Sequence, residues 1–291
     1  MRSRLLTVTK IKLIAMIGVL TAIVPATGPT IAKAATTTAR HVSVLLYNYN
    51  FKGTGRIVNN SAPAGPKASL TLHGTWQRVP EGVRFSGNTD GAESVAYGRP
   101  ASGYTLNQPS SNAVGIGTRI VYYTPARGKC FADTPNITQI GRYSQRTKSA
   151  QAKIQLSSCA TSRTRVLMEC RFAGARTASH APPMVSRMPL ISGHVYNVRC
   201  VKSPDHVNGK ATITLAVTDL NYRGGRRTVT NAFTVRDLGY LRTADYISAG
   251  NKYPLPRPAH NTDQFNGTVS RVVFCAGAPA AVGRCLAAYL P

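Results

Sequence analysis

Short segments of alternating apolar and polar residues, separated by turn residues, dominate this sequence. The clearest is residues 211–218, whose apolar positions are Ala211, Ile213, Leu215 and Val217. A period of two places such side chains on one face of a β-strand. The same pattern predicts strands over residues 42–47, 68–72, 83–86, 118–123, 137–143, 152–157, 165–172, 196–201, 228–235 and 268–274. The only helix that the sequence predicts is a short one over residues 280–290.

Turn residues lie between these segments, as in Pro63-Ala64-Gly65-Pro66 and Asn208-Gly209. Many short strands with turns between them indicate an all-β sandwich or barrel. For a chain of this length we predict a two-sheet antiparallel jelly-roll sandwich. No Pro/Ser-rich linker or internal repeat divides the sequence. We therefore expect one domain over residues 35–291, with a short C-terminal extension.

Residues 1–34 have the pattern of a secretory signal peptide. A basic start precedes an apolar stretch over residues 13–24, and Ala32-Lys33-Ala34 has the small residues that a signal peptidase recognises. The apolar stretch is shorter than the roughly 20 residues that a membrane-spanning helix needs. We therefore predict cleavage after Ala34 and a secreted, extracellular protein with no membrane span. An uncleaved N-terminal anchor is the alternative.

Six cysteines in an exported chain indicate disulfides. They are Cys130, Cys159, Cys170, Cys200, Cys275 and Cys285. A predicted hairpin, residues 137–143 and 152–157, brings Cys130 near Cys159 at its open end. Cys170 and Cys200 end strands that we expect to be neighbours, and Cys275 and Cys285 close a short loop. These three pairings are our prediction among the 15 that six cysteines allow. No Cys-x-x-Cys pair supports a zinc site.

The formal net charge of +26 favours anionic partners such as acidic glycans, cell-wall polymers or nucleic acid. The basic residues are scattered, however, and one local cluster stands out: Arg223, Arg226 and Arg227. It is a candidate patch for an anionic partner, and it also has the composition of a solvated hairpin tip. Nothing in this distribution indicates specific recognition of nucleic acid.

Three stretches, taken in order, carry a resemblance to a known family. The first runs from residues 46–51 through 70–72 to 83–85, and the second comprises residues 135–141, 152–156, 170–172 and 193–200. The third includes Phe265-Asn266-Gly267-Thr268-Val269. Together they resemble the laminin G / concanavalin A-like lectin and glucanase family, in its secreted actinobacterial form. The resemblance spans residues 42–274 and implies a last strand that returns beside the first.

Two positions depart from that family's pattern. Val195 and Tyr196 stand where the family often has Trp-His, and Ser270 stands where its final strand usually has an acidic residue. The second departure weakens any polar contact inherited from the family. Strand alternation predicts two faces on this last strand, one with Val269, Arg271 and Val273 and the other with Ser270, Val272 and Phe274.

Some relatives with this fold hydrolyse glycans, which requires two carboxylates flanking the bond. The glutamates of this chain are Glu81, Glu93 and Glu169, and none lies at strand spacing from another carboxylate. No Gly-x-Ser-x-Gly motif occurs, and the six histidines are isolated from one another. The sequence therefore predicts no catalytic residues and a protein that is not an enzyme.

Exposed tyrosines can stack on a sugar or anchor a protein partner. Of 13 tyrosines, five fall in loop-like stretches: Tyr97, Tyr104, Tyr222, Tyr246 and Tyr253. Asp90 and Asp219 join them as candidate ligand contacts. Calcium recurs in proteins that resemble this one, and Asp90, Asp133 and Asp219 could ligate it. Turn capping also accounts for an aspartate in a turn, so we predict no cofactor and no metal.

The sequence thus predicts a secreted binding module for glycans, cell-wall polymers or other anionic cell-surface polymers. One alternative is an envelope module that binds an extracellular protein or has a structural role. The second alternative is a divergent glycan-active hydrolase.

Overall fold

The computed structural model describes residues 44–291, with the backbone alone at residues 44–46. Outside the description lie residues 1–43, 64, 86–93, 101–107, 110, 125–133, 145, 147–148, 159–160, 162–164, 178–182, 205–208, 237, 242–245 and 253–263. The predicted signal peptide and its cleavage site fall in the first of these ranges. Within the described residues, no helix is long and apolar enough to cross a membrane.

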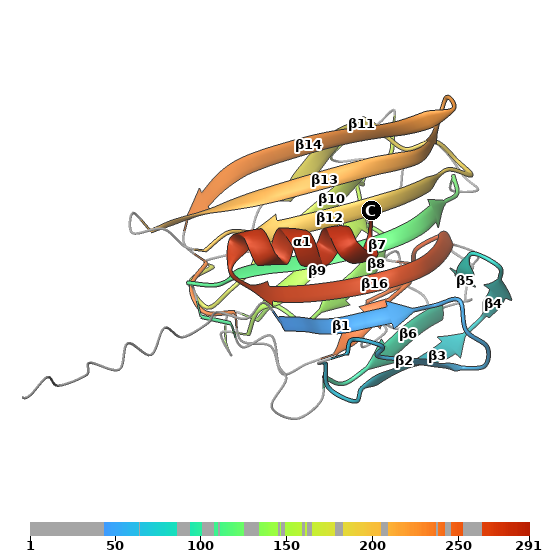
Figure 1. Ribbon diagram of the computed structural model, residues 1–291, viewed down its shortest axis with the longest axis horizontal. Coiled ribbons are helices and arrows are strands. Elements are labelled where there is room, and N and C mark those ends of the chain that lie inside the picture. The colour runs from blue at the N-terminus through green and yellow to red at the C-terminus, as the bar shows by residue number, and fades with distance from the viewer. Residues whose placement is uncertain are drawn as a thin grey trace, which may run out of the picture. The chain divides into compact units, whose positions relative to one another are not determined.

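Two antiparallel sheets form the fold (Figure 1). The strands of sheet A are β1 (Val44–Asn50), β4 (Trp76–Val79), β5 (Gly82–Phe85), β7 (Ala113–Tyr122), β12 (Val195–Lys202), β13 (Lys210–Tyr222), β14 (Gly225–Arg236) and β16 (Gly267–Gly277). Their order is β14-β13-β12-β7-β16-β5-β4, and β1 also pairs with β16. The last strand therefore returns beside the first, as the family resemblance implies.

The strands of sheet B are β2 (Ile57–Asn59), β3 (Ser69–Gly74), β6 (Ser94–Gly98), β8 (Asn136–Ile140), β9 (Gln151–Leu156), β10 (Leu167–Ala173), β11 (Met184–Pro189) and β15 (Ile247–Ala249). Their order is β11-β10-β9-β8-β15-β6-β3-β2. The predicted two-sheet antiparallel jelly-roll sandwich is confirmed. Each predicted strand overlaps an observed one, whereas β2, β4, β6, β11 and β15 were not predicted. These five are three to six residues long.

The core lies between the sheets and consists of the inward side chains of both. Ile213, Leu215 and Val217 of β13 are fully buried there, as are Met168 and Phe172 of β10. On β13 the intervening residues are mostly threonines on the opposite face. The alternation over residues 211–218 is therefore the signature of a strand with one face in the core.

One disulfide, between Cys170 and Cys200, crosses this core. Cys170 belongs to β10 of sheet B and Cys200 to β12 of sheet A, and both are fully buried. The pairing agrees with the prediction, but the expectation that the two strands are neighbours is wrong. Both cysteines occupy inward positions, so their Cα atoms lie 6.4 Å apart across the sandwich. The predicted pair Cys130 and Cys159 lies outside the described residues.

Helix α1 (Pro279–Tyr289) covers part of the outer face of sheet A, over β7, β16 and β12 (Figure 1). Val282, Leu286 and Leu290 are buried against it. Gly117 on β7 makes room for the helix, because a Cβ there would lie 2.4 Å from Leu290 Cδ1. A disulfide from Cys275 on β16 to Cys285 also holds the helix. The predicted helix over residues 280–290 is therefore present.

A register shift in β16 corrects the predicted faces of this strand. The shift lies between Val269 and Arg271, beside Ser270, whose carbonyl accepts a hydrogen bond from Phe51 N at 2.9 Å. A β-bulge of this kind inserts one extra residue. As a result Val269 and Val272 both face the core, whereas the alternation predicted opposite faces for them.

Two tyrosine rings from β1 lie in the core. Those of Tyr47 and Tyr49 are stacked with centroids 5.8 Å apart, and the Tyr49 hydroxyl is buried without a hydrogen-bond partner. Burial, and secondarily the neighbouring Tyr47, raises the pKa of Tyr49 well above its usual range. Burial likewise raises the pKa of Tyr122 to about 12.

We expect these tyrosines to make the protein sensitive to alkali. In the unfolded chain a tyrosine ionises at about pH 10, whereas the buried tyrosines stay protonated, so unfolding releases protons above that pH. The stability from neutral buried phenols is therefore fully present below about pH 10 and is lost as the pH rises toward 12 and beyond. In urea titrations, the free energy of unfolding of the Tyr49→Phe variant should fall less between about pH 10 and about pH 12 than that of the native protein. Equal losses in the two proteins would contradict this account.

Candidate functional site

The outer face of sheet B, which points away from the core, carries a row of polar and aromatic side chains. Residues directly opposite each other on neighbouring strands point to the same side of a sheet. This pairing connects six strands through Thr71, Tyr97, Ser248, Gln139, Lys153 and Arg171, here called the central row. Their chain neighbours, such as Ala96, Ile140 and Phe172, are buried in the core. The central row therefore lies on the outer face.

A second row lies beside it on the same face and consists of Asn136, Gln155 and Glu169, here called the buried row. All three are at most 1% exposed. Gln155 Nε2 donates to Glu169 Oε2 at 2.8 Å, and a terminal nitrogen of Arg171 lies 3.7 Å from the same oxygen. Five buried atoms nevertheless have no hydrogen-bond partner: Asn136 Oδ1 and Nδ2, Gln155 Oε1, Glu169 Oε1 and Arg171 Nε.

These unpartnered atoms mark the row as a candidate site. Buried polar atoms are nearly always hydrogen-bonded, and leaving one unpaired costs about 1–3 kcal/mol. Of the five, three accept hydrogen bonds and two donate them. A hydroxyl group can do both, so a molecule with several hydroxyl groups matches this mixture. The buried row is therefore a candidate site for a molecule with several hydroxyl groups.

An aromatic cluster lies at the other end of the central row. The Tyr97 ring stacks on His73 at 4.5 Å and meets Tyr246 edge to face at 6.1 Å. The guanidinium of Arg99 lies 5.7 Å from the centre of the Tyr246 ring. The structure thus brings together two of the tyrosines predicted as ligand contacts. Tyr97 lies on β6 itself, however, and not in a loop.

The other predicted contacts that the structure describes lie at the hairpin between β13 and β14 in sheet A. Its turn is Arg223-Gly224, with positive φ angles of 37° and 79°. Two positive φ values in a two-residue connection are typical of a type I′ hairpin. Tyr222 lies within 6.0 Å of the Arg223 guanidinium and 5.0 Å of that of Arg227. The predicted arginine cluster is therefore at a hairpin tip, in a different sheet from Tyr97 and Tyr246.

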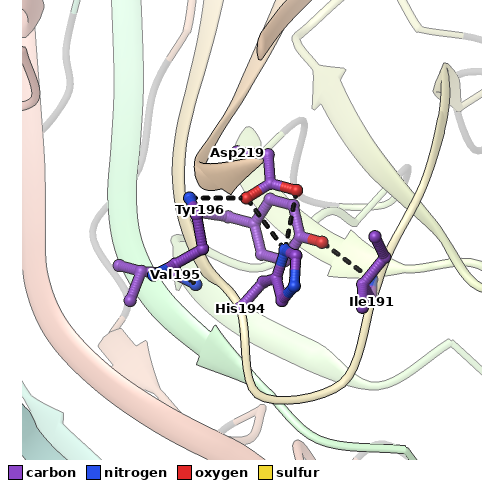
Figure 2. A network of polar contacts seen from close by, with 6 residues as sticks. Ile191, His194, Val195, Tyr196 and Asp219 are labelled. Atoms are coloured by element: carbon purple, nitrogen blue, oxygen red, sulfur yellow. Dashed lines mark hydrogen bonds and ion pairs between the residues drawn. The ribbon is translucent and has the colours of Figure 1, made fainter. Parts of the chain in front are cut away.

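Asp219, also predicted as a contact, has protein partners of its own (Figure 2). Its two carboxylate oxygens lie 3.1 and 2.9 Å from His194 Nδ1, and one of them accepts a hydrogen bond from Asn221 N. Beside it the Tyr196 hydroxyl accepts a hydrogen bond from Ile191 N at 2.7 Å. This network joins the start of β12 to the end of β13, which accounts for the buried carboxylate without calcium.

Neither a metal site nor a carboxylate pair emerges from the described residues. They contain no group of three His, Cys, Asp or Glu side chains suited to a metal ion. Their acidic residues are Glu81, Glu169 and Asp219. Glu169 is therefore the one carboxylate on the outer face of sheet B in the described part of the chain. The predicted positions Asp90, Asp133, Tyr104 and Tyr253 lie outside it.

Sequence reasoning missed most of this face, although its signal was present. The predicted strands over residues 137–143, 152–157 and 165–172 alternate apolar residues with Gln139, Lys153, Gln155, Glu169 and Arg171. Alternation assigns these polar residues to the face away from the core. The predicted hairpin of residues 137–143 and 152–157 is confirmed as β8 and β9. Alternation does not tell which other strands lie side by side, so the complete rows were not predictable.

Comparisons with known proteins add a fold likeness. No protein family matches the sequence, and no curated protein matches it either. Among solved structures, it is similar to basic winged bean lectin with Tn-antigen, at 12% identity over 81% of this chain and 99% of the lectin, with a TM-score of 0.46. It is also similar to the PL-14 alginate lyase from Aplysia kurodai, at 7% identity over 81% of this chain and 100% of the lyase, with a TM-score of 0.41.

A third similar structure is the binding domain of botulinum neurotoxin DC in complex with SialylT. Its identity to this chain is 10%, and its TM-score is 0.45. The match covers 85% of this chain and 52% of the toxin domain. Identities this low concern the arrangement of strands and leave the chemistry of the site to be argued from its own residues.

Proposed function

We propose that the protein is a secreted carbohydrate-binding module without catalytic activity, and that its ligand lies on the outer face of sheet B. The observation that carries this proposal is the buried row, whose four unpartnered polar atoms lie on the face away from the core beside a fifth on Arg171. The N-terminal pattern and the two disulfides among the described residues support secretion.

The two ends of this face suit different parts of a sugar chain. Tyr97 and Tyr246 offer aromatic surface to the apolar side of a sugar ring. At the other end, Lys153 and Arg171 add positive charge beside the buried row, which favours glycans with carboxylate or sulfate groups. The central row crosses six strands, or about 24 Å at a strand spacing of about 4.8 Å. That length suits an oligosaccharide lying across the strands.

We expect Tyr97→Ala to weaken glycan binding by at least about tenfold, because it removes the central aromatic ring of the cluster. An array of neutral and uronic-acid oligosaccharides would identify a ligand, and isothermal titration calorimetry would measure its affinity. Tyr240→Ala is the matched control, since Tyr240 is 43% exposed and belongs to no strand of either sheet.

Two results would overturn the proposal. If the Tyr97→Ala and Tyr240→Ala variants bound the glycan with equal affinity and both had native melting temperatures, the aromatic cluster would not be part of the site. Release of new chain ends from any polysaccharide on the array would show a glycan-active enzyme instead of a binding module.

A further inference from the structure

Four arginines share the outer face of sheet A: Arg119 on β7, Arg199 on β12, Arg226 on β14 and Arg271 on β16. Arg119 and Arg271 are direct partners across the two strands, and Asn197 is the partner of Arg119 on its other side. The chain neighbours Ile120, Val198 and Val272 are in the core, so the three arginines beside them and Asn197 face outward. Arg226 is two residues from Thr228, which is joined to Asn197 through Thr218, so it lies on the same face.

Two of these guanidinium groups are held in place by the protein. Arg119 Nε donates to Asn197 Oδ1 at 2.7 Å, and Asn197 Nδ2 donates to Pro291 O. Arg271 donates from a terminal nitrogen to Tyr289 O at 3.1 Å, at the end of α1. An arginine has five N–H donors, and these contacts use one from each. The remaining donors are therefore positioned in advance for an acceptor.

The charges of this face are unbalanced. Like charges directly opposite each other destabilise a sheet. Burial, followed by the nearby charges of Arg271 and Arg226, lowers the pKa of Arg119. No acidic side chain of the described residues forms an ion pair with any of the four arginines. A bound anion would relieve this repulsion.

We propose that Arg119, Arg199, Arg226 and Arg271 form a second binding site, which takes the sulfate or carboxylate groups of an acidic polysaccharide. The row continues from Asn197 to Thr218 and Thr228, whose hydroxyl oxygens are 2.9 Å apart. It crosses five strands, about 19 Å at about 4.8 Å per strand. A polymer with repeated anionic groups fits this length better than one small ion does.

One feature favours a polysaccharide over single-stranded nucleic acid. The row itself consists of guanidinium, amide and hydroxyl groups, whereas single-stranded nucleic acid is bound on platforms of aromatic rings. Guanidinium groups pair with sulfate and carboxylate as they do with phosphate, so the choice between a polysaccharide and duplex DNA is left to the test below. The site is on the outer face of the opposite sheet from the buried row, so it stands independently of the function proposed above.

The test uses the double variant Arg119→Gln/Arg226→Gln and dextran sulfate, with uncharged dextran as the reference ligand. Calorimetry at fixed salt should show dextran sulfate bound at least about tenfold more weakly, because charge-assisted hydrogen bonds are lost. The control variant Lys67→Gln/Lys210→Gln removes the same charge from exposed positions: Lys67 precedes β3 of sheet B, and Lys210 begins β13, far along that strand from Thr218. It should retain the native affinity within about twofold, since exposed distant charges are screened. Arg226→Gln alone, at an exposed position, covers the case in which the double variant does not fold.

Each of three results would overturn the proposal. The first is equal weakening in the lysine control, which would indicate net charge alone. The second is native affinity in the folded double variant. The third is tighter binding of a DNA duplex than of dextran sulfate at equal charge and salt, which would assign the face to nucleic acid.

Discussion

Replacing Cys170 and Cys200 with alanine is expected to lower the free energy of unfolding by about 3.5 kcal/mol. The disulfide closes a loop with a sequence separation of 30, and the loss of chain entropy in the unfolded state gives this magnitude. It joins the two sheets through the core, so its removal also leaves two buried positions underfilled. Urea titrations of the native and variant proteins measure the difference.

The second disulfide provides the comparison. Cys275 and Cys285 are only 10 residues apart, so the same argument gives about 2.7 kcal/mol for their replacement. That variant should also loosen α1, because Cys285 belongs to the helix. Hydrogen exchange would then show faster exchange in α1 and unchanged protection in β10. A smaller loss for the Cys170 and Cys200 pair than for this one would contradict the role of the cross-sheet bond.

Asn136→Leu is expected to have opposite effects on stability and on binding. Asn136 is 1% exposed, and neither its amide oxygen nor its amide nitrogen has a partner. A leucine branches at Cγ in the same way and carries no polar atoms, so it removes that cost, and the free energy of unfolding should rise by about 1–3 kcal/mol. The same change removes a donor and an acceptor from the proposed sugar site. Glycan affinity, measured by calorimetry, should therefore fall by at least about tenfold.

Asn197→Leu is the matched control for this variant. Asn197 is also 1% exposed, but its amide accepts from Arg119 and donates to Pro291. Its replacement should destabilise the protein and leave binding on sheet B unchanged. If both variants were destabilised and both still bound the glycan, the buried row would have no part in the site.

Under the proposed function, the buried row is a trade between stability and binding. Buried amide and carboxylate atoms without hydrogen-bond partners add nothing to the stability of a sandwich. Positions that break a local folding rule without a compensating gain in stability are expected at functional sites. Stabilising substitutions at Asn136, Gln155 or Glu169 that cost binding would be the mark of such a trade.

The core faces of the long strands were predictable from the sequence. On β13 and β10, alternation assigns Ile213, Leu215 and Phe172 to the core, and the structure buries all three. Alternation is a local property, because successive side chains of a strand point to opposite sides wherever the strand lies. The same alternation assigns the polar residues Gln139, Lys153 and Gln155 to the face away from the core.

Other features depended on the tertiary structure. The bulge beside Ser270 puts Val269 on the same face as Val272, and no local sequence pattern predicts this bulge. Tyr97 and Tyr246 are distant in sequence and meet because β6 pairs with β15.

The sequence by itself determined that this chain forms short strands with one apolar face. It also predicted the two disulfides that the structure describes, Cys170–Cys200 and Cys275–Cys285. Only the tertiary structure decided that Cys170 and Cys200 face each other from different sheets and that Asn136, Gln155 and Glu169 line up across three strands. The physical reason is that side-chain direction follows from the backbone of each strand. Strand order depends instead on how all strands together bury their apolar faces.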